Sequence, residues 1–355
     1  MNDNIITYFK ENGMLNPRRS VNLINKAIDF NQLDLKGLIV FTEAASGEFI
    51  YTPIIAAMAG AKKVYAITKD SQYATKEEVK KNTMLFAELC GVKDKICVIF
   101  DKQKINKADI ITNLGFVRPI DKQTIDMLKI DAVISCMCEA WEVRNEDVDI
   151  DYCKKKAINV MGTNENYPGL DVFEFSGPLA LKMLFDAGIE IYKSKIIIVS
   201  GDDFGKVIYA TLSKVSSDVV LVRNLNEENY SLLRDVDAII IADYTSEKCF
   251  IGKNAFGISS EKLKSLSDFI TVIQFAGIVD IDDLKKNNIS FYPNYKVGNF
   301  RMGRTLAYLG PKPIIDLHCA GLKVGEIMHK NYKRYIKNQL CDEFTIIEGE
   351  NNETI

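Results

Sequence analysis

Residues 195–223 read KIIIVSGDDFGKVIYATLSKVSSDVVLVR, and this stretch decides the fold class. The apolar run from Ile196 stops at a turn that contains Gly201, and residues 205–215 then have the spacing of an amphipathic helix. A second apolar run, residues 219–222, follows the helix. The pattern predicts a strand, a tight turn, a helix and a parallel strand, which is the βαβ unit that opens a dinucleotide-binding domain.

The turn in this unit departs from the usual phosphate-binding pattern. Aligned on Gly205, the three glycine positions of G-x-G-x-x-G hold Ser200, Asp202 and Gly205, so only the last glycine is kept. The carboxylates of Asp202 and Asp203 would oppose a pyrophosphate at the helix N-terminus. Two interpretations stay open, because the domain either binds a dinucleotide through an altered turn or has lost that site.

Composition limits the class of protein. The chain has 355 residues, of which 47% are hydrophobic and 26% charged, enough for a large core and two domains. A formal net charge of −3 does not favour nucleic acid as a partner. Residues 1–13 lack the pattern of a signal peptide, and no apolar run is long enough to span a membrane, so we expect a cytoplasmic protein. Eight cysteines, mostly in apolar segments, and two histidines predict reduced thiols and no metal site.

Strand-like and helix-like segments alternate through the rest of the chain, which predicts mostly parallel sheets with helices on both faces. The clearest early unit is residues 37–68, with a loop that contains Ser46 and Gly47. An acidic residue at a strand end, Glu43, followed by this Ser-Gly pair loosely resembles the first motif of S-adenosylmethionine-dependent methyltransferases. A tight strand-to-helix turn with no ligand is the alternative interpretation.

Five segments are similar, in order and spacing, to the D-isomer-specific 2-hydroxyacid dehydrogenases. The resemblance implies an α/β protein with two doubly wound domains, in which a Rossmann-like nucleotide domain (residues 170–293) is inserted into a discontinuous flavodoxin-like domain (residues 1–169 plus 294–355). It also implies a small-molecule substrate, bound in a cleft between the domains, and a homodimer. The similar segments are residues 108–136, VDIDYCKKKAINVMGTN (148–164), VFEFSGPLALKMLF (172–185), VIQFAGIVDIDDL (272–284) and IIDLHCAG (314–321).

The same resemblance implies a catalytic histidine. His318 in DLHCAG matches the acid/base histidine of the family, and histidine titrates near neutral pH, which suits a proton donor to a keto acid. A half-buried structural histidine at a strand end is the alternative. The family's arginine and carboxylate are missing from their usual places. Asp316 would replace the carboxylate, on the same face as His318 if the segment is extended, and Arg144, Arg301 or Arg304 would replace the cation.

The cofactor expected on this interpretation is NADP or NAD. Arg223 stands where an acidic residue would bond the ribose 2′-hydroxyl, and an arginine there accommodates a 2′-phosphate, which favours NADP. The same side chain could instead pair with a nearby surface glutamate. The predicted cofactor-binding residues are Ser200, Gly201, Asp202, Phe204 and Gly205 in the turn, Arg223, Asp243 and Tyr244 after later strands, and Gln274.

Three functions remain open from the sequence. The first is an NAD(P)-dependent oxidoreductase that acts on a small keto or hydroxy acid, or a related carbonyl compound, with His318 as the proton donor. The second is a non-catalytic nucleotide- or metabolite-binding protein on the same scaffold, which the acidic turn favours. The third is an S-adenosylmethionine-dependent transferase with its site at residues 43–49.

Overall fold

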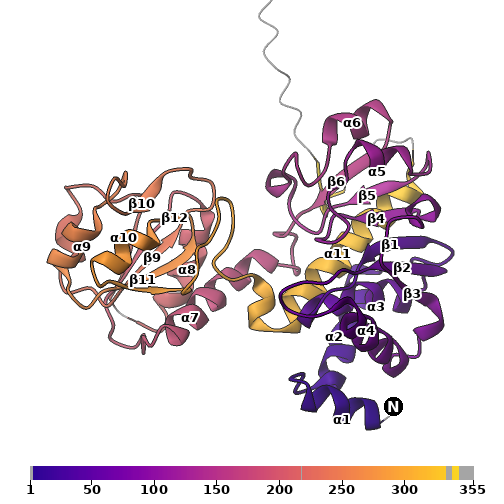
Figure 1. The fold of residues 1–355 in the computed structure, drawn as a ribbon, viewed down its shortest axis with the longest axis horizontal. Helices are drawn as coiled ribbons and strands as arrows, with labels where there is room; N and C mark the ends of the chain where they lie inside the picture. Colours follow the sequence, from indigo (N-terminus) through magenta and orange to yellow (C-terminus); the bar gives the residue numbers. More distant parts are fainter. Residues whose placement is uncertain (1–2, 217, 333–337, 344–355) are drawn as a thin grey trace, which may run out of the picture. The chain divides into compact units, whose positions relative to one another are not determined.

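The computed structural model describes residues 3–216, 218–332 and 338–343. They divide into two compact units, one made of Met1–Val172 with Gly310–Ile355 and the other of Phe173–Leu309. Each unit contains its own parallel sheet flanked by helices (Figure 1). The predicted α/β class with two parallel sheets is therefore confirmed. Residues 294–309, which the sequence analysis assigned to the first domain, belong to the second unit.

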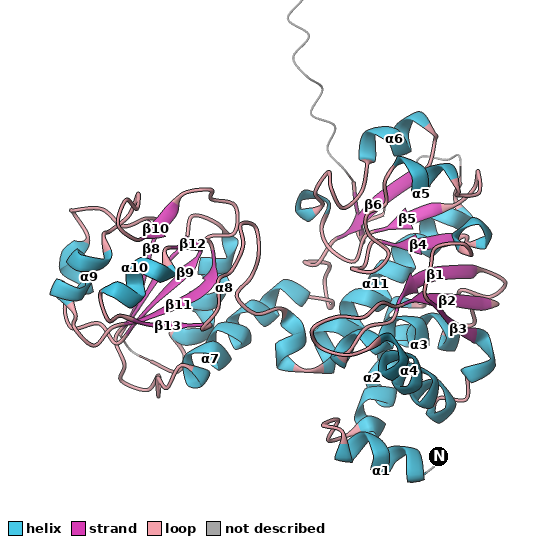
Figure 2. Ribbon diagram, in the orientation of Figure 1, coloured by secondary structure: helices cyan, strands magenta, loops and turns pink. Residues whose placement is uncertain are grey.

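The first unit is built on a sheet whose described strands are parallel except for the last (Figure 2). Numbered along the chain, the parallel strands lie in the order 3-2-1-4-5-6. In dinucleotide-binding domains with this order, ligands bind at the carboxyl edge where the order reverses, which here is between β1 and β4. Across the sheet the strands are β3 (Ile96–Ile99), β2 (Lys63–Ile67), β1 (Ile39–Glu43), β4 (Ile110–Thr112), β5 (Val133–Ser135), β6 (Asn159–Thr163) and the antiparallel β14 (Cys341–Asp342).

Helices cover both faces of this sheet, and the last of them comes from the segment that follows the second unit. This helix, α11 (Pro311–Lys330), packs on β4, β5, β6, α2 and α3 and buries most of its apolar residues. It therefore completes the core of the first unit. The other helices of the unit are α1 (Asp3–Glu11), α2 (Pro17–Asn31), α3 (Tyr51–Met58), α4 (Lys76–Leu89), α5 (Lys122–Asp126) and α6 (Ile150–Lys155), with short 3₁₀ turns that include η1 (Gly47–Ile50) and η4 (Ala140–Glu142).

The second unit has five parallel strands in its main sheet, and the predicted βαβ unit forms part of it. Within this unit the order is 2-1-3-4-5, the flavodoxin-like order, and the first unit has the Rossmann order, which is the reverse of the assignment made from the sequence. Alternate residues of β7 enter two separate apolar cores, one on each face, which explains the continuous run IIIV. The strands are β8 (Val219–Val222), β7 (Ile196–Val199), β9 (Ala238–Ala242), β11 (Thr271–Ala276) and β13 (Ser290–Tyr292), with a separate pair β10 (Cys249–Ile251) and β12 (Ile278–Val279). The helices are α7 (Ser176–Asp186), α8 (Asp203–Leu212), α9 (Ser260–Leu266) and α10 (Ile281–Lys286).

The expected extended conformation around residues 314–321 is wrong, because this segment lies inside α11. Pro311 occupies the first helical turn, a position that proline favours, and the helix then continues to Lys330. A short apolar run such as IIDLHCA fits a buried strand or a buried helix equally well. The length of the surrounding segment and the residues that flank the run decide which of the two forms. Among the described residues, no helix combines the length and apolar character needed to cross a membrane.

Candidate functional site

The turn after β7 is the predicted dinucleotide site, and its backbone donors already have partners. Asp202 caps α8, with Oδ1 accepting from the N–H of Phe204 at 3.0 Å and Oδ2 from the N–H of Tyr244 at 2.7 Å. The Asp243 carboxylate accepts from the N–H of Gly201 at 2.8 Å and from that of Ser246 at 3.1 Å. Two amides of the turn that would bind a pyrophosphate, those of Gly201 and Phe204, are thus bonded to carboxylates of the chain itself.

The glycines of this turn allow close packing. A Cβ on Gly201 would lie 2.7 Å from Oδ2 of Asp243, and a Cβ on Gly205 would overlap the side chain of Ser200. The Ser200 hydroxyl accepts from the N–H of Gly205 at 3.1 Å. Burial raises the pKa of Asp202, although the hydrogen bond from the Tyr244 amide opposes this change. Ser200, Gly201, Asp202 and Gly205 are therefore brought together, as predicted, but around an internal hydrogen-bond network.

Three other predicted cofactor residues differ in their surroundings. Phe204 is buried, and its ring centroid lies 4.6 Å from that of Phe173 and 5.5 Å from that of Phe275. Tyr244 packs on the same aromatic cluster, at 6.0 Å from Phe204. Arg223 follows β8 directly and is exposed. Only Arg223 of these three presents its side chain to solvent.

Gln274 lies in β11, close to the segment of the same unit that contains Gly303. Its side chain is 2% exposed, and Nε2 donates to the carbonyl of Gly277 at 2.7 Å. The N–H of Gly303 donates to the carbonyl of Phe275 at 2.6 Å, so the chain near Gly303 crosses the carboxyl end of β11. The Oε1 atom of Gln274 is buried and has no hydrogen-bond partner in the described part of the chain. The predicted contact of Gln274 with a cofactor therefore stays a prediction, and its burial does not favour it.

His318 is buried in α11, with 2% of its surface exposed. Its Nδ1 lies 2.7 Å from the hydroxyl oxygen of Thr52 in α3, and its ring packs 6.1 Å from that of Phe49. Burial lowers the pKa of His318 to about 3, so the imidazole is neutral at physiological pH. These contacts favour a packing role, and the catalytic role of His318 stays a prediction.

Asp316 and Arg144 make contacts of their own. Because the segment is helical, residues 316 and 318 point away from each other, and Asp316 pairs with Lys312 one turn earlier. Burial raises the pKa of Asp316, and the Lys312 charge opposes this change. Arg144 lies in the loop after η4, where burial raises the pKa of Glu142 to about 7 and the Arg144 charge opposes that increase. The expected pairing of Asp316 with His318 is therefore wrong.

A pocket of about 260 Å³ lies in the first unit at the carboxyl edge of its sheet. It is formed by four segments that are far apart in the sequence: the turn between α1 and α2, the loop after β1, the loop after β2, and α4. Ligands bind at this carboxyl edge in such sheets, although the strand order reverses between β1 and β4 and the pocket lies on the β1–β2 side of that point. The described residues that line it are Phe9, Asn12, Gly13, Met14, Ser46, Gly47, Glu48, Ile50, Ala74, Val79 and Asn82.

The two strand ends that support this pocket are in direct register. Glu43 pairs with Ile67, and the N–H of Ala44 donates to the Ile67 carbonyl at 2.9 Å, so the loops after β1 and β2 leave the sheet side by side. Gly47 has φ +63°, and a Cβ there would meet no atom within 4 Å. The loop therefore uses glycine for its left-handed backbone and leaves open space beside it.

Asp70, three residues after β2, was not singled out by the sequence analysis, and it is not among the described residues that line the pocket. Its Oδ1 accepts from the N–H of Lys76 at 2.8 Å, and the side chain is exposed. An acidic residue about 20 positions after the glycine turn is the usual ribose ligand in domains with this strand order. The spacing from Gly47 to Asp70 was a usable signal, but the glycine pattern drew attention to the later βαβ unit.

Contacts with α4 and α3 fix the wall that the α1–α2 turn contributes. The Tyr8 hydroxyl donates to Oδ1 of Asn82 at 2.8 Å, and the Phe9 and Phe86 rings pack edge to face at 5.4 Å. The Tyr51 hydroxyl lies 3.7 Å from the sulfur of Met14. Because both helices support the turn, the pocket has defined walls on the side away from the sheet.

Two carboxylates lie near this edge. Glu48 lines the pocket; burial raises its pKa, and the Tyr51 hydroxyl and the Arg19 charge partly oppose this change. Glu43 is buried at the end of β1, where an oxygen accepts from the N–H of Phe116 at 2.7 Å, and burial raises its pKa also. Among the described residues that line the pocket, Glu48 carries the only formal charge.

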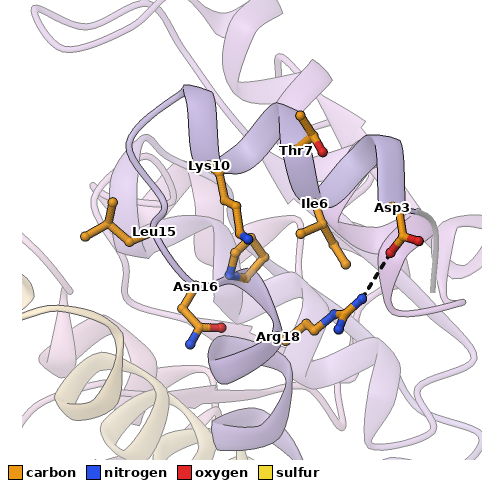
Figure 3. Close-up of a pocket in the computed structure, with 8 residues that line it drawn as sticks. Asp3, Ile6, Thr7, Lys10, Leu15, Asn16 and Arg18 are labelled. Atoms are coloured by element: carbon orange, nitrogen blue, oxygen red, sulfur yellow. Dashed lines mark hydrogen bonds and ion pairs between the residues drawn. The ribbon is translucent and has the colours of Figure 1, made fainter.

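Two further groups of side chains have some features of a site. A pocket of about 390 Å³ between α1 and α2 is lined by Lys10 and Arg18, and the Arg18 guanidinium pairs with Asp3 at 3.0 Å (Figure 3). It lies away from the strand ends, on the exposed side of the N-terminal helices. In the described residues, Asp109, Asp131 and His329 are close enough to hold a metal ion, but the Lys129 ammonium already pairs with Asp109 and Asp131.

No family model matches the sequence, and no curated protein matches it. A chain of dipicolinate synthase from Bacillus halodurans is similar in structure, with a TM-score of 0.52 and 13% identity, over 84% of this chain and 98% of that chain. The corresponding dipicolinate synthase chain from Bacillus subtilis has a TM-score of 0.50 and 11% identity, over 84% and 97% of the chains. A putative D-3-phosphoglycerate dehydrogenase from Ralstonia solanacearum has a TM-score of 0.48 and 9% identity, over 83% and 95% of the chains.

The two dipicolinate synthase chains share the fold of this protein. At such low identities a common fold does not carry a common activity, since unrelated reactions use the same α/β scaffold. The functional argument therefore rests on the residues of this chain.

Proposed function

We propose that this protein binds an adenosine-containing small molecule without phosphate groups in the pocket at the carboxyl edge of the first sheet. The observation that carries the proposal is the position of this pocket, between the loops after β1 and β2 of a sheet with the order 3-2-1-4-5-6. A ligand there would have the Gly47 turn on one side and the first turns of α4 on another.

The charge of the pocket supports a nucleoside over a dinucleotide. No lysine, arginine or histidine is among the described residues that line it, and Glu48 would repel a pyrophosphate. Apolar side chains, including Phe9, Met14 and Val79, suit a purine ring. S-adenosylmethionine is a ligand of this class, and it would supply an electrophilic methyl group for a transfer reaction.

A thermal-shift panel with S-adenosylmethionine, S-adenosylhomocysteine, adenosine, NADH and NADPH tests the proposal. A ligand at about 100 times its dissociation constant adds roughly 2.7 kcal/mol to the free energy of unfolding. We expect a shift with the three nucleosides, and we expect Ala74→Trp, which fills the pocket, to abolish it. Tyr73→Trp is the matched control, because Tyr73 is the exposed neighbour that does not line the pocket. If wild-type protein responds to none of the nucleosides, the proposal is wrong.

A second candidate is an NAD(P)-dependent oxidoreductase that uses the turn after β7. The exposed Arg223 directly after β8 favours it, since a 2′-phosphate would lie at that strand end. The carboxylates of Asp202 and Asp243 oppose it, since they accept from the Phe204 and Gly201 amides of the turn. A shift with NADPH that survives Ala74→Trp and disappears in Arg223→Glu would favour this second function.

A further inference from the structure

We infer that Glu48 makes the pocket selective for a ligand that carries a positive charge, such as a sulfonium, over its neutral counterpart. The inference rests on the nucleoside binding proposed above and adds the charge of the ligand to it. It follows from the position of this carboxylate, the surroundings of its side chain, and the exposure of Arg19, the cation whose charge acts on it.

The backbone of Glu48 is fixed beside open space. Gly47 precedes it with a left-handed backbone, and the carbonyl of Glu48 accepts from the N–H of Tyr51 at the end of η1. Tyr51 itself is held by the Ser20 hydroxyl at 3.0 Å and is almost fully buried. The carboxylate therefore belongs to a rigid part of the wall.

The surroundings of Glu48 strengthen any attraction to a cation in the pocket. The other lining side chains are apolar or uncharged, and the two asparagines, Asn12 and Asn82, are the largest polar groups among them. A charge that faces a weakly polar wall is screened less than a charge in water. No other lining residue competes for the carboxylate as a counter-ion within the described part of the chain.

Arg19, whose positive charge acts on Glu48, is only a partial partner. Arg19 opposes the burial of the carboxylate, but Arg19 is exposed, so water and salt screen its charge. Burial still raises the pKa of Glu48 despite the hydrogen bond from the Tyr51 hydroxyl and the charge of this arginine. A positive group in the pocket would stabilise the ionised carboxylate, which is the state that burial disfavours.

Isothermal titration of the full chain with S-adenosylmethionine and S-adenosylhomocysteine tests the inference, because the two differ by the methylsulfonium charge. We expect the wild-type protein to prefer S-adenosylmethionine by roughly tenfold. The Glu48→Gln variant should bind both with nearly equal affinity, and Glu48→Asp should keep the preference. Glu77→Gln is the matched control, since it removes an exposed carboxylate of α4 that does not line the pocket.

The outcomes separate the two proposals. Equal affinities in the wild-type protein, or an unchanged preference in Glu48→Gln, would overturn the charge selectivity while nucleoside binding still stood. Lack of binding of both compounds and of adenosine would overturn both. Circular dichroism of each variant shows whether it is folded, and Glu48→Asp provides a second test if Glu48→Gln does not fold.

Discussion

His318 is a residue whose chemistry is set by burial. The ring lies between α3 and α11, with the Thr52 hydroxyl at one nitrogen and the Phe49 ring beside it. Because the pKa of His318 falls to about 3 in the folded protein, the unfolded chain binds a proton near pH 6.5 that the folded chain does not bind. Stability is therefore full above pH 6.5 and is lost as the pH falls from 6.5 towards 3.

The His318→Gln variant tests this linkage. In the wild-type protein, His318 lowers the free energy of unfolding by up to about 1.4 kcal/mol for each pH unit below 6.5. We expect His318→Gln to have a shallower dependence between pH 6.5 and 5, measured by urea denaturation at several pH values. His329→Gln is the control, because it removes the other histidine, which is partly exposed. Identical slopes in His318→Gln and wild-type protein would contradict the argument.

At the scale of elements, the periodicity of the sequence predicted the strands and the helix around the turn between β7 and α8. It did not predict the hydrogen bonds inside that turn. The strand, helix and strand at residues 196–222 were predicted correctly, because apolar spacing reports which side chains are buried. The hydrogen bonding of the amides in the turn was not predictable from apolar spacing. It depends on Asp243, which follows a different strand and bonds the Gly201 amide only in the folded unit.

Replacement of Asp202 measures how much the hydrogen bonds of this turn contribute to the free energy of unfolding. Asp202→Ala removes the cap of α8 and leaves the Tyr244 amide without its acceptor, so we expect a loss of about 1–2 kcal/mol in the free energy of unfolding. Asp203→Ala is the matched control, since Asp203 is exposed and forms an exposed ion pair with Lys206, and we expect a loss of about 0.5 kcal/mol or less. Chemical denaturation gives both values. Equal losses would mean that Asp202 does not act as a cap.

At the scale of the whole molecule, the class of fold was predictable and the strand order was not. Alternating strands and helices indicate parallel sheets, but the order across a sheet depends on pairings between distant segments, such as β1 with β4. The full lining of the pocket was hidden for the same reason. The approach of residues 12–14 to the loop at residues 46–48 leaves no periodic pattern, although the sequence analysis had named residues 43–49 together as an alternative S-adenosylmethionine site. The predicted homodimer and cytoplasmic location stay predictions.

The division into two units predicts different behaviour of their fragments. Residues 173–309 contain a complete sheet and both of its apolar cores, so we expect this fragment to unfold cooperatively by itself. Residues 1–172 lack α11, which buries its apolar side against three strands of the first sheet, so we expect no cooperative transition from them. Thermal unfolding followed by circular dichroism checks both fragments. A sharp transition in residues 1–172 would mean that α11 is dispensable.

The position of α11 near the end of the chain also determines when the first unit can complete its core during synthesis on the ribosome. When residue 172 has been made, the surface that α11 will cover on β4, β5 and β6 is still bare. The ribosome must then add residues 173–330 before that helix exists, which takes roughly eight to thirty seconds at about 5–20 residues per second. During this interval the inserted unit can finish folding while the earlier part of the nascent chain remains open to chaperones and to aggregation.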